Sequence, residues 1–360
     1  MECPHIPEIK YGSFSEHIHS RVLAERIPID GTIELTHRCN LNCIHCYCNL
    51  PANNRKVQEK ELTTKEVFRI LDEIAEEGCL WFLITGGEPL LRKDFKEIYA
   101  YAKKKGMLIT LFTNGTLITE QIADFLRDYP PFLVEITIYG ASKKTYEKIT
   151  RVPRSFSRCL RGIDLLLERK IQLKLRTVPM RMNYAEFRAM KSFSESCGLE
   201  FHFDSCINPR LDGSLSPCNV RLSPEEVVKL DLEDERRVLE FKKSYQEFET
   251  SSTTNFLYNC SGGVDTFSIN PYGHLQICLM VTKPFFNLRE GSFHHGWKKF
   301  IPEEIRSLPK KGQSQCDGCR NRPLCAHCPA WAELETGNPE APIEYLCKIA
   351  SLRKEVFGLK

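Results

Sequence analysis

The 360-residue sequence has no run of about 18 apolar residues, no excess of one charge and no low-complexity segment. The first absence argues against a membrane-spanning helix. Fifty basic and 47 acidic side chains give a net charge of +3, which provides no reason to expect a nucleic acid or an anionic membrane as partner. The N-terminus lacks the basic segment and apolar core of a secretory signal. We therefore expect a cytoplasmic protein that binds neither nucleic acid nor membrane.

Cysteine, in contrast, is abundant, with 17 in the chain. Cytosolic proteins with CxxC-type spacings bind metal more often than they form disulfides. Cys39, Cys43 and Cys46 follow an apolar, strand-like run. Thiolates select iron–sulfur clusters or zinc, and a complete cluster normally takes four cysteines. Three thiolates would leave one iron open to another ligand. Zinc, with Cys48 as a fourth ligand, is the alternative.

A second motif lies some 40 residues further on, where the predicted buried strand 81–85 is followed by Gly86-Gly87-Glu88-Pro89. Glycines let the backbone approach a ligand closely, and a glutamate accepts hydrogen bonds from an ammonium group. Such a sequence alone is typical of a turn. Together with the cysteine triplet it resembles the radical S-adenosylmethionine (AdoMet) enzymes, in which three cysteines hold a [4Fe–4S] cluster whose open iron binds AdoMet. The resemblance disfavours zinc.

Short apolar runs alternate with amphipathic segments from residue 31 onward. Strands are predicted at 32–36, 81–85, 108–112, 133–138, 172–178 and 200–203, and helices at 64–77, 94–105, 119–127, 155–169 and 183–197. Six such units predict an α/β fold with a parallel sheet and right-handed crossovers. The resemblance implies a partial (β/α)6, TIM-like barrel. A charged helix is predicted from 223 toward 249.

A second set of cysteines occupies the C-terminal third, beyond a polar linker at 250–255. These seven resemble the SPASM extension of radical AdoMet enzymes, which holds two auxiliary [4Fe–4S] clusters. The resemblance assigns one cluster to Cys316, Cys319, Cys325 and Cys347, and the other to Cys260, Cys278 and Cys328, with one open or non-cysteine position. The two residues before Cys328, where the family more often has three, leave His327 as an alternative ligand; a zinc ribbon is the other possibility. We predict a lead-in at 1–30, a barrel at 31–250 and a SPASM domain at 251–360.

Function in such barrels gathers in the loops after the strands. The resemblance implies that residues following successive strands, together with a histidine beside the third cysteine, bind AdoMet: His45, Gly86, Gly87, Glu88, Pro89, Thr113, Asn114, Thr137 and Arg176. Near the end of the sixth strand, Asp204, Arg210 and Asp212 are candidates for substrate contact or proton transfer, because a carboxylate at a barrel mouth suits a general base.

The resemblance also implies a mechanism and a class of substrate. A flavodoxin- or ferredoxin-like donor would reduce the first cluster, and AdoMet would supply a 5′-deoxyadenosyl radical that abstracts hydrogen. Enzymes with this barrel and seven-cysteine extension mostly modify peptides or proteins by thioether or carbon–carbon crosslinks or by oxidation. Segments 139–142 and 151–156 look closer to peptide maturases. Because only about 30 residues precede the first strand, we expect either a separate leader-binding protein or a substrate that is recognised without a leader.

Three alternatives remain from the sequence. The first is an oxidation of the sulfatase-maturing type, and the second is a small-molecule oxidoreductase that acts, for example, on a tetrapyrrole or a sugar. The third is a non-catalytic electron-transfer or zinc protein. No residue in the sequence names the substrate.

Overall fold

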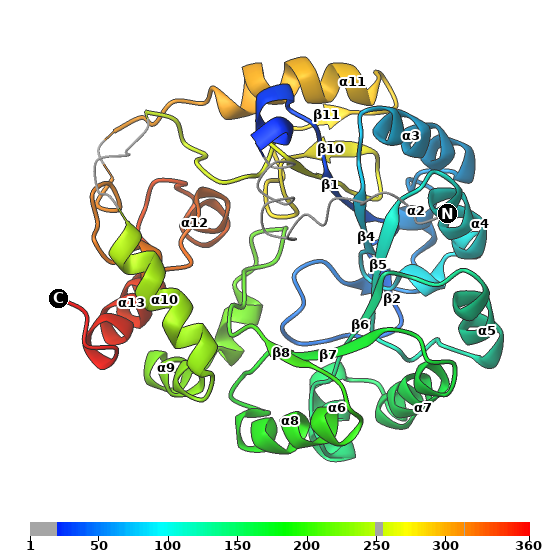
Figure 1. Cartoon of the computed structure of the whole chain (residues 1–360), viewed down its shortest axis with the longest axis horizontal. Coiled ribbons are helices and arrows are strands. Elements are labelled where there is room, and N and C mark those ends of the chain that lie inside the picture. The colour runs from blue at the N-terminus through cyan, green and yellow to red at the C-terminus, as the bar shows by residue number, and fades with distance from the viewer. Residues whose placement is uncertain (1–19, 249–254, 313) are drawn as a thin grey trace, which may run out of the picture.

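The computed structural model describes residues 20–248, 255–312 and 314–360. Its main sheet contains nine strands in the order β11-β10-β9-β1-β4-β5-β6-β7-β8. The strands from β1 to β8 pair in parallel and curve into an open barrel with helices around the outside (Figure 1). The predicted α/β fold, a partial barrel built on a parallel sheet and followed by a cysteine-rich region, is confirmed.

Each predicted barrel strand is present. The barrel strands are β1 (Asp30–Glu34), β4 (Trp81–Thr85), β5 (Leu108–Thr113), β6 (Leu133–Thr137), β7 (Leu173–Thr177) and β8 (Phe201–Phe203). The remaining strands are β9 (Thr266–Ile269), β10 (His274–Gln276) and β11 (Phe286–Asn287), with a separate parallel pair, β2 (Arg38–Cys39) and β3 (Leu50–Pro51).

The barrel helices also match the predictions, with two additions, the short helices α2 and α6. They are α2 (Arg55–Gln58), α3 (Thr64–Glu76), α4 (Phe95–Lys104), α5 (Glu120–Asp128), α6 (Lys143–Thr150), α7 (Ser155–Glu168) and α8 (Phe187–Ser196), with short 3-10 turns η1 (Pro89–Leu91) and η2 (Tyr184–Glu186). Helix α6 was not predicted, because it is short and strongly polar. The Thr119 side chain caps α5, whereas the Asp94 carboxylate binds Arg92 and Thr64 and makes no capping hydrogen bond to α4.

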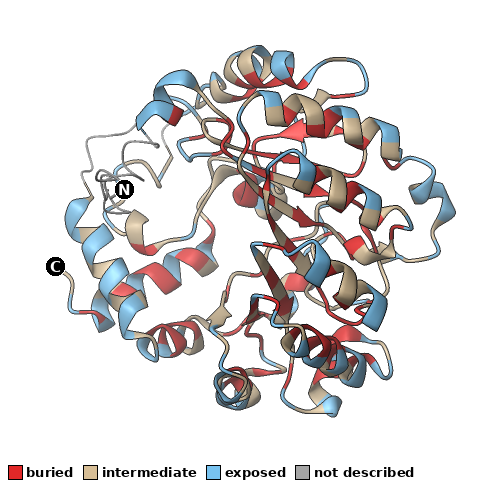
Figure 2. Ribbon diagram, turned by 45° about the vertical axis from the view of Figure 1, so that its right-hand side comes forward, coloured by how far each residue is buried: buried red, intermediate tan, exposed pale blue. Residues whose placement is uncertain are grey.

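Alternate side chains along each strand point to opposite sides of the sheet. One set lies in the apolar core between the sheet and the helices, and the other faces the inside of the barrel. On β5 the buried residues Ile109 and Leu111 belong to the same apolar core as Ile70 and Ile74 of α3. Successive side chains of a strand point to opposite faces, so Thr110 and Phe112 face the interior of the barrel. Figure 2 shows the buried residues on the sheet and on the inner faces of the helices. The interior is therefore left to the polar groups that build the site.

The C-terminal half adds helices α9, α10, α12 and α13 on the open side of the barrel, and α11 beside α3 (Figure 1). They are α9 (Pro224–Leu232), α10 (Glu235–Glu247), α11 (Phe293–His295), α12 (Pro329–Thr336) and α13 (Glu344–Val356), with η3 (Ser216–Val220), η4 (Gly296–Arg306) and η5 (Arg322–Leu324). The single charged helix predicted over 223–249 is wrong: the Asp234 carboxylate accepts from Arg237 N and begins a second helix.

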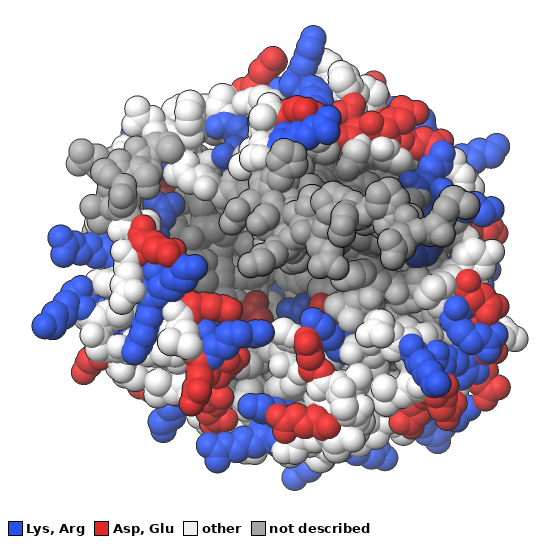
Figure 3. All heavy atoms as spheres, in the orientation of Figure 1, with Lys and Arg blue, Asp and Glu red and all other residues white. Residues whose placement is uncertain are grey.

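Strand β9 joins the two halves of the chain. It pairs in parallel with β1, and the Phe267 ring packs against Gly31. The predicted boundary at 250 lies outside the described residues, as do residues 1–19 of the predicted lead-in. Acidic and basic side chains are interspersed over the face in Figure 3. Among the described helices, none is long and apolar enough to cross a bilayer.

Candidate active site

Cys39, Cys43 and Cys46 lie together in the loop that leaves β1 at the barrel mouth. Burial raises the pKa of Cys43 well above its usual value, and the neighbouring Cys46 and Cys39 thiolates raise it further. Backbone hydrogen bonds tie the loop to α6, because Ile44 N donates to Ile149 O at 3.2 Å. The structure therefore brings the predicted triplet together and anchors it on the unpredicted helix.

Cys46 is the cysteine of the triplet whose pKa the surrounding protein lowers. The Cys48 thiol and the backbone amides of Cys48 and Asn49 all donate to Cys46 Sγ, and they lower the pKa of Cys46 to about 7 although desolvation opposes the shift. The Cys48 thiol thus points at another sulfur. Among the described residues, no three His, Cys, Asp or Glu side chains converge tightly enough to hold a single metal ion.

The two glycines of the Gly86-Gly87-Glu88-Pro89 motif pack closely on the backbone of residues 36–38, and their approach to a ligand stays a prediction. A Cβ on Gly86 would lie 2.3 Å from Thr36 O, and one on Gly87 would lie 2.4 Å from Arg38 O. Gly86 also has a φ of +130°, which disfavours any side chain. The glycines are needed because this turn packs on the backbone that leads into the cysteine loop. Pro89 then opens η1.

Glu88 is completely buried and held by three donors. Its carboxylate accepts from Thr113 Oγ1 (2.8 Å), Asn114 N (2.8 Å) and Leu90 N (3.1 Å). Burial raises the pKa of Glu88 to about 7, although these hydrogen bonds oppose the rise. Asn114 Nδ2 also lies 3.7 Å from Cys39 Sγ. The structure therefore joins Glu88, Thr113 and Asn114 to the cysteine triplet.

His45 carries an unused polar atom. Its Nδ1 is buried without a hydrogen-bond partner, and burial lowers the pKa of His45 to about 4, so the ring is neutral. The ring centroid lies 4.9 Å from that of Tyr139. A neutral imidazole with an open nitrogen beside a second ring fits an aromatic base such as the adenine of AdoMet. The donor set and this orphaned nitrogen together fit a cluster with bound AdoMet.

Tyr139 is a site residue that the sequence analysis did not select. Its hydroxyl contacts the Cys43 thiol and the Thr137 side chain. Burial raises the pKa of Tyr139 well above its usual value, and the nearby cysteine thiolates raise it further. The sequence offered one signal for this role: Tyr139 lies two residues after the fourth barrel strand, where functional residues of such barrels gather.

Thr137 and Arg176 face each other in register across β6 and β7. The Arg176 guanidinium lies 5.1 Å from the Phe112 ring centroid and 3.3 Å from Glu135 Oε2. Arg176 is therefore held against the inner wall of the barrel, on the same strand ends that carry Thr113 and Tyr139.

The three predicted catalytic residues do not form one group. Arg210 donates to Cys46 O (3.1 Å), Asn49 Oδ1 (2.7 Å) and Asn49 O (3.2 Å), and pairs with the exposed Asp212 at 3.2 Å. Asp204 instead accepts from Cys206 N at 2.9 Å. These contacts favour a positioning role for Arg210 on the cysteine loop, and the catalytic assignment of Asp204, Arg210 and Asp212 stays a prediction.

The C-terminal cysteines separate into two groups. Burial raises the pKa of Cys325 to about 11, with further contributions from the nearby Cys347, Cys316 and Cys319 thiolates. Burial likewise raises the pKa of Cys328 to about 11, with contributions from Cys278 and Cys260. The grouping is the one that the resemblance implied.

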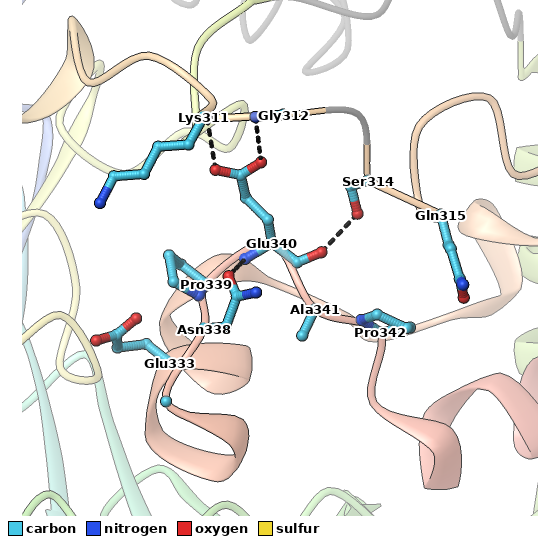
Figure 4. A pocket seen from close by; sticks show the side chains of 11 residues that line it. Lys311, Gly312, Ser314, Gln315, Glu333, Asn338, Pro339, Glu340, Ala341 and Pro342 are labelled. Atoms are coloured by element: carbon cyan, nitrogen blue, oxygen red, sulfur yellow. Dashed lines mark hydrogen bonds between the residues drawn. The ribbon is translucent and has the colours of Figure 1, made fainter.

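His327 lies with the first of these groups, away from Cys328. Its side chain hydrogen-bonds Cys316 and lowers the pKa of that thiol, while its Nε2 lies 2.9 Å from Ala341 O. Figure 4 shows the neighbouring cavity of about 750 Å³, where the Glu340 carboxylate accepts from Lys311 N and Gly312 N and so fixes the segment leading to Cys316.

Fold and site together define a class: an open α/β barrel whose mouth holds three thiols and a buried carboxylate. Residues 33–193 match the radical SAM superfamily. The chain is 27% identical to an AdoMet-dependent heme synthase of Methanosarcina barkeri over 85% of this chain and 92% of that protein. It is 26% identical to the mycofactocin maturase MftC of Mycobacterium tuberculosis over 87% of this chain and 81% of that protein.

The fold is similar to that of Streptococcus suis SuiB bound to S-adenosylmethionine, with a TM-score of 0.69, 16% identity and coverage of 96% and 83% of the two chains. SuiB bound to the precursor peptide SuiA gives a TM-score of 0.67 and 17% identity over 95% and 83%. The chain thus contains a radical SAM domain over residues 33–193, and it is an enzyme. The family implies a [4Fe–4S] cluster and AdoMet.

Proposed function

We propose that this enzyme uses radical AdoMet chemistry to modify a peptide or protein, by a thioether or carbon–carbon crosslink or by oxidation. The observation that carries the proposal is the convergence of three thiols and the buried Glu88 carboxylate at the barrel mouth. The peptide as substrate is supported by the similarity to MftC along most of the chain and to SuiB in fold.

When bound, the cluster and AdoMet supply a 5′-deoxyadenosyl radical that abstracts hydrogen from carbon. Cys39, Cys43 and Cys46 would hold the cluster. Glu88 would accept from the ammonium group of AdoMet, because its carboxylate is already fixed by Thr113 and Asn114. His45 and Tyr139 would border the base. The barrel wall excludes water and holds the reacting groups in place.

The seven C-terminal cysteines would hold two auxiliary [4Fe–4S] clusters, in the two groups described above. A flavodoxin- or ferredoxin-like donor, a separate leader-binding protein and a cytoplasmic location complete the proposal. Cys260 and Cys347 are exposed, and an exposed ligand gives a short path to an electron carrier.

A tetrapyrrole is the second candidate substrate. It is favoured by one observation, the match to the heme synthase over 92% of that protein. A maturase and a heme synthase share the radical chemistry, so the substrate has to be tested directly.

The test begins with anaerobic reconstitution with iron and sulfide, AdoMet and a reductant. The enzyme is expected to release 5′-deoxyadenosine, and to shift the mass of a short precursor peptide encoded beside its gene. Conversion of an iron porphyrin without any change in the peptide would replace the first candidate by the second. Absence of 5′-deoxyadenosine from iron-loaded protein would overturn both.

A further inference from the structure

A cavity of about 390 Å³, here called the interloop pocket, lies between the two cysteine systems. One wall contains Cys48, whose thiol donates to Cys46 Sγ. Another wall contains Leu279, the residue directly after Cys278, and Leu211 of the loop after β8 completes the enclosure. A group in this pocket is therefore separated by one side chain from a predicted ligand of the first cluster. On its opposite side it meets the neighbour of an auxiliary ligand.

Aromatic rings line much of the interloop pocket. Tyr47, Tyr272, His274 and Phe285 all contribute to its walls. His274 and Phe285 stack with centroids 3.6 Å apart and an interplanar angle of 11°, while the His37 and Tyr272 rings meet edge to face at 5.4 Å. Rings held in this way present faces and edges to a further ring, and aromatic pairs stabilise one another beyond the area that they bury.

The buried charged groups of the pocket already have hydrogen-bond partners within the protein. Glu34 is 1% exposed and accepts from Tyr47 Oη at 2.9 Å, with His37 Nε2 at 3.0 Å from its other oxygen. Arg210 is engaged with Asp212 and with the cysteine loop. Of the charged residues that line this described pocket, Lys283 alone has no ion pair, and it is exposed at the rim. The interior therefore offers no unpaired charge to a charged group.

We propose that the interloop pocket receives a neutral aromatic side chain of the peptide substrate, an inference that rests on the proposed function. Its volume lies near the lower end of ligand pockets, about 300–1,000 Å³, which suits one ring-bearing side chain and its own backbone. Lys283 and Thr282, both exposed at the rim, would donate to backbone carbonyls of the peptide. The pocket thereby sets which residue of the peptide reaches the radical.

The experiment measures binding of two small probes to the cluster-loaded protein by ligand-observed NMR. The probes are N-acetyl-tryptophanamide and N-acetyl-leucinamide. We expect the aromatic probe to bind at least about tenfold more tightly, and Leu211→Trp, which fills the pocket, to weaken its binding about tenfold or more. Leu239→Trp is the matched control, because Leu239 is 65% exposed on α10, and it should leave binding unchanged.

Equal binding of the two probes, or full binding by a correctly folded Leu211→Trp protein, would overturn the proposal. If Leu211→Trp loses iron or secondary structure, Phe285→Ala takes its place; it removes one ring of the wall and should weaken the aromatic probe at least about threefold. Unchanged binding by Phe285→Ala would then overturn it. Because probe binding requires no AdoMet cleavage, loss of peptide modification with intact probe binding would count against the proposed function alone.

Discussion

The barrel mouth and the C-terminal cysteine region both gather thiols, but they are built differently. At the mouth, backbone hydrogen bonds tie the cysteine loop to α6, and the supporting carboxylate of Glu88 accepts from Thr113 and Asn114. In the C-terminal region, Cys260 and Cys347 are exposed, and the segments that carry the cysteines are mostly loops and single turns. Strands and buried hydrogen bonds hold the residues of the mouth in place. The C-terminal region has fewer such elements to hold its thiols.

The difference suggests how each region responds to loss of metal. Where ligands are not preorganised, the free energy of metal binding is also folding free energy. The mouth is supported by the sheet and by buried hydrogen bonds, so it should keep its shape without a cluster. The C-terminal region should loosen.

The largest effect should come from exchanging one cysteine in each region. Cys43→Ala should abolish release of 5′-deoxyadenosine and leave the melting temperature of the cluster-free protein nearly unchanged. Cys319→Ala should keep AdoMet cleavage within about tenfold but abolish product, and make the segment 314–330 sensitive to protease. Each variant should lose about four irons. Iron analysis, chromatography of 5′-deoxyadenosine and limited proteolysis measure these outcomes; protection of 314–330 in the second variant would contradict the comparison.

Glu88→Gln should have the next largest effect. Replacing a buried, hydrogen-bonded carboxylate that binds an ammonium group costs about 1.5–3 kcal/mol, so AdoMet affinity should fall about 10- to 100-fold while the iron content stays normal. Equilibrium dialysis with labelled AdoMet measures this. An unchanged affinity would remove Glu88 from the site.

The same glutamate predicts a pH dependence. Burial raises the pKa of Glu88 from 4.5 to about 7, so the folded protein holds a proton that the unfolded chain has lost. Its contribution, about 3 kcal/mol, is present below pH 4.5 and is lost as pH rises through about 7. Urea unfolding of the cluster-free protein should therefore show stability falling between pH 5 and 8. Glu88→Gln should remove that slope, and a slope that persists would assign it to another group.

Arg210→Gln should act on the cysteine loop. The substitution removes donors from Cys46 O and Asn49 O, so a chelator should extract iron from the first cluster about tenfold faster. Loss of a nearby cation should also lower the reduction potential of that cluster, and Arg210→Lys should restore part of it. Arg188→Gln is the control, because Arg188 is an 83% exposed side chain on α8. Spectroscopic redox titration measures the potential; equal potentials in wild type and Arg210→Gln would limit Arg210 to packing.

Tyr139→Phe should give the smallest change. It removes one hydroxyl that contacts Cys43 and leaves the ring beside His45. A single hydrogen bond contributes about 1 kcal/mol, so AdoMet cleavage should slow by about fivefold. A loss as large as that of Cys43→Ala would mean that Tyr139 has a further role.

Local patterns predicted the architecture well because each barrel strand carries its own signal. Apolar runs bounded by polar turns located all six strands, and the cysteine spacing located both cysteine regions. The roles of Gly86 and Gly87 were not predictable, because they depend on the backbone of residues 36–38, some 50 positions earlier in the sequence. Tyr139 was missed for the same reason. Its hydroxyl contacts Cys43 only because the fold brings the end of β6 next to the cysteine loop.

Long-range pairing also explains the two other surprises. Arg210 looked like a residue that reaches substrate, yet its partners lie on a loop 160 positions away in sequence. The sequence after 223 has the pattern of a single charged helix. In the structure, Asp231 is buried between Arg237 and Arg353, and these ion pairs fix the first helix, α9, against α13.

The hydrogen bonding of β9 to β1 bears on how this enzyme can be re-engineered. A chimera that exchanges everything beyond residue 250 for the same region of a relative would also replace the outer neighbour of the strand that feeds the cysteine loop. The incoming sequence would have to supply a ring that fits over Gly31, since any Cβ there would lie 2.5 Å from Phe267. Without that match, β1 would become a bare edge, open to pairing with other chains. Modular swaps should therefore carry β1 along with the C-terminal half.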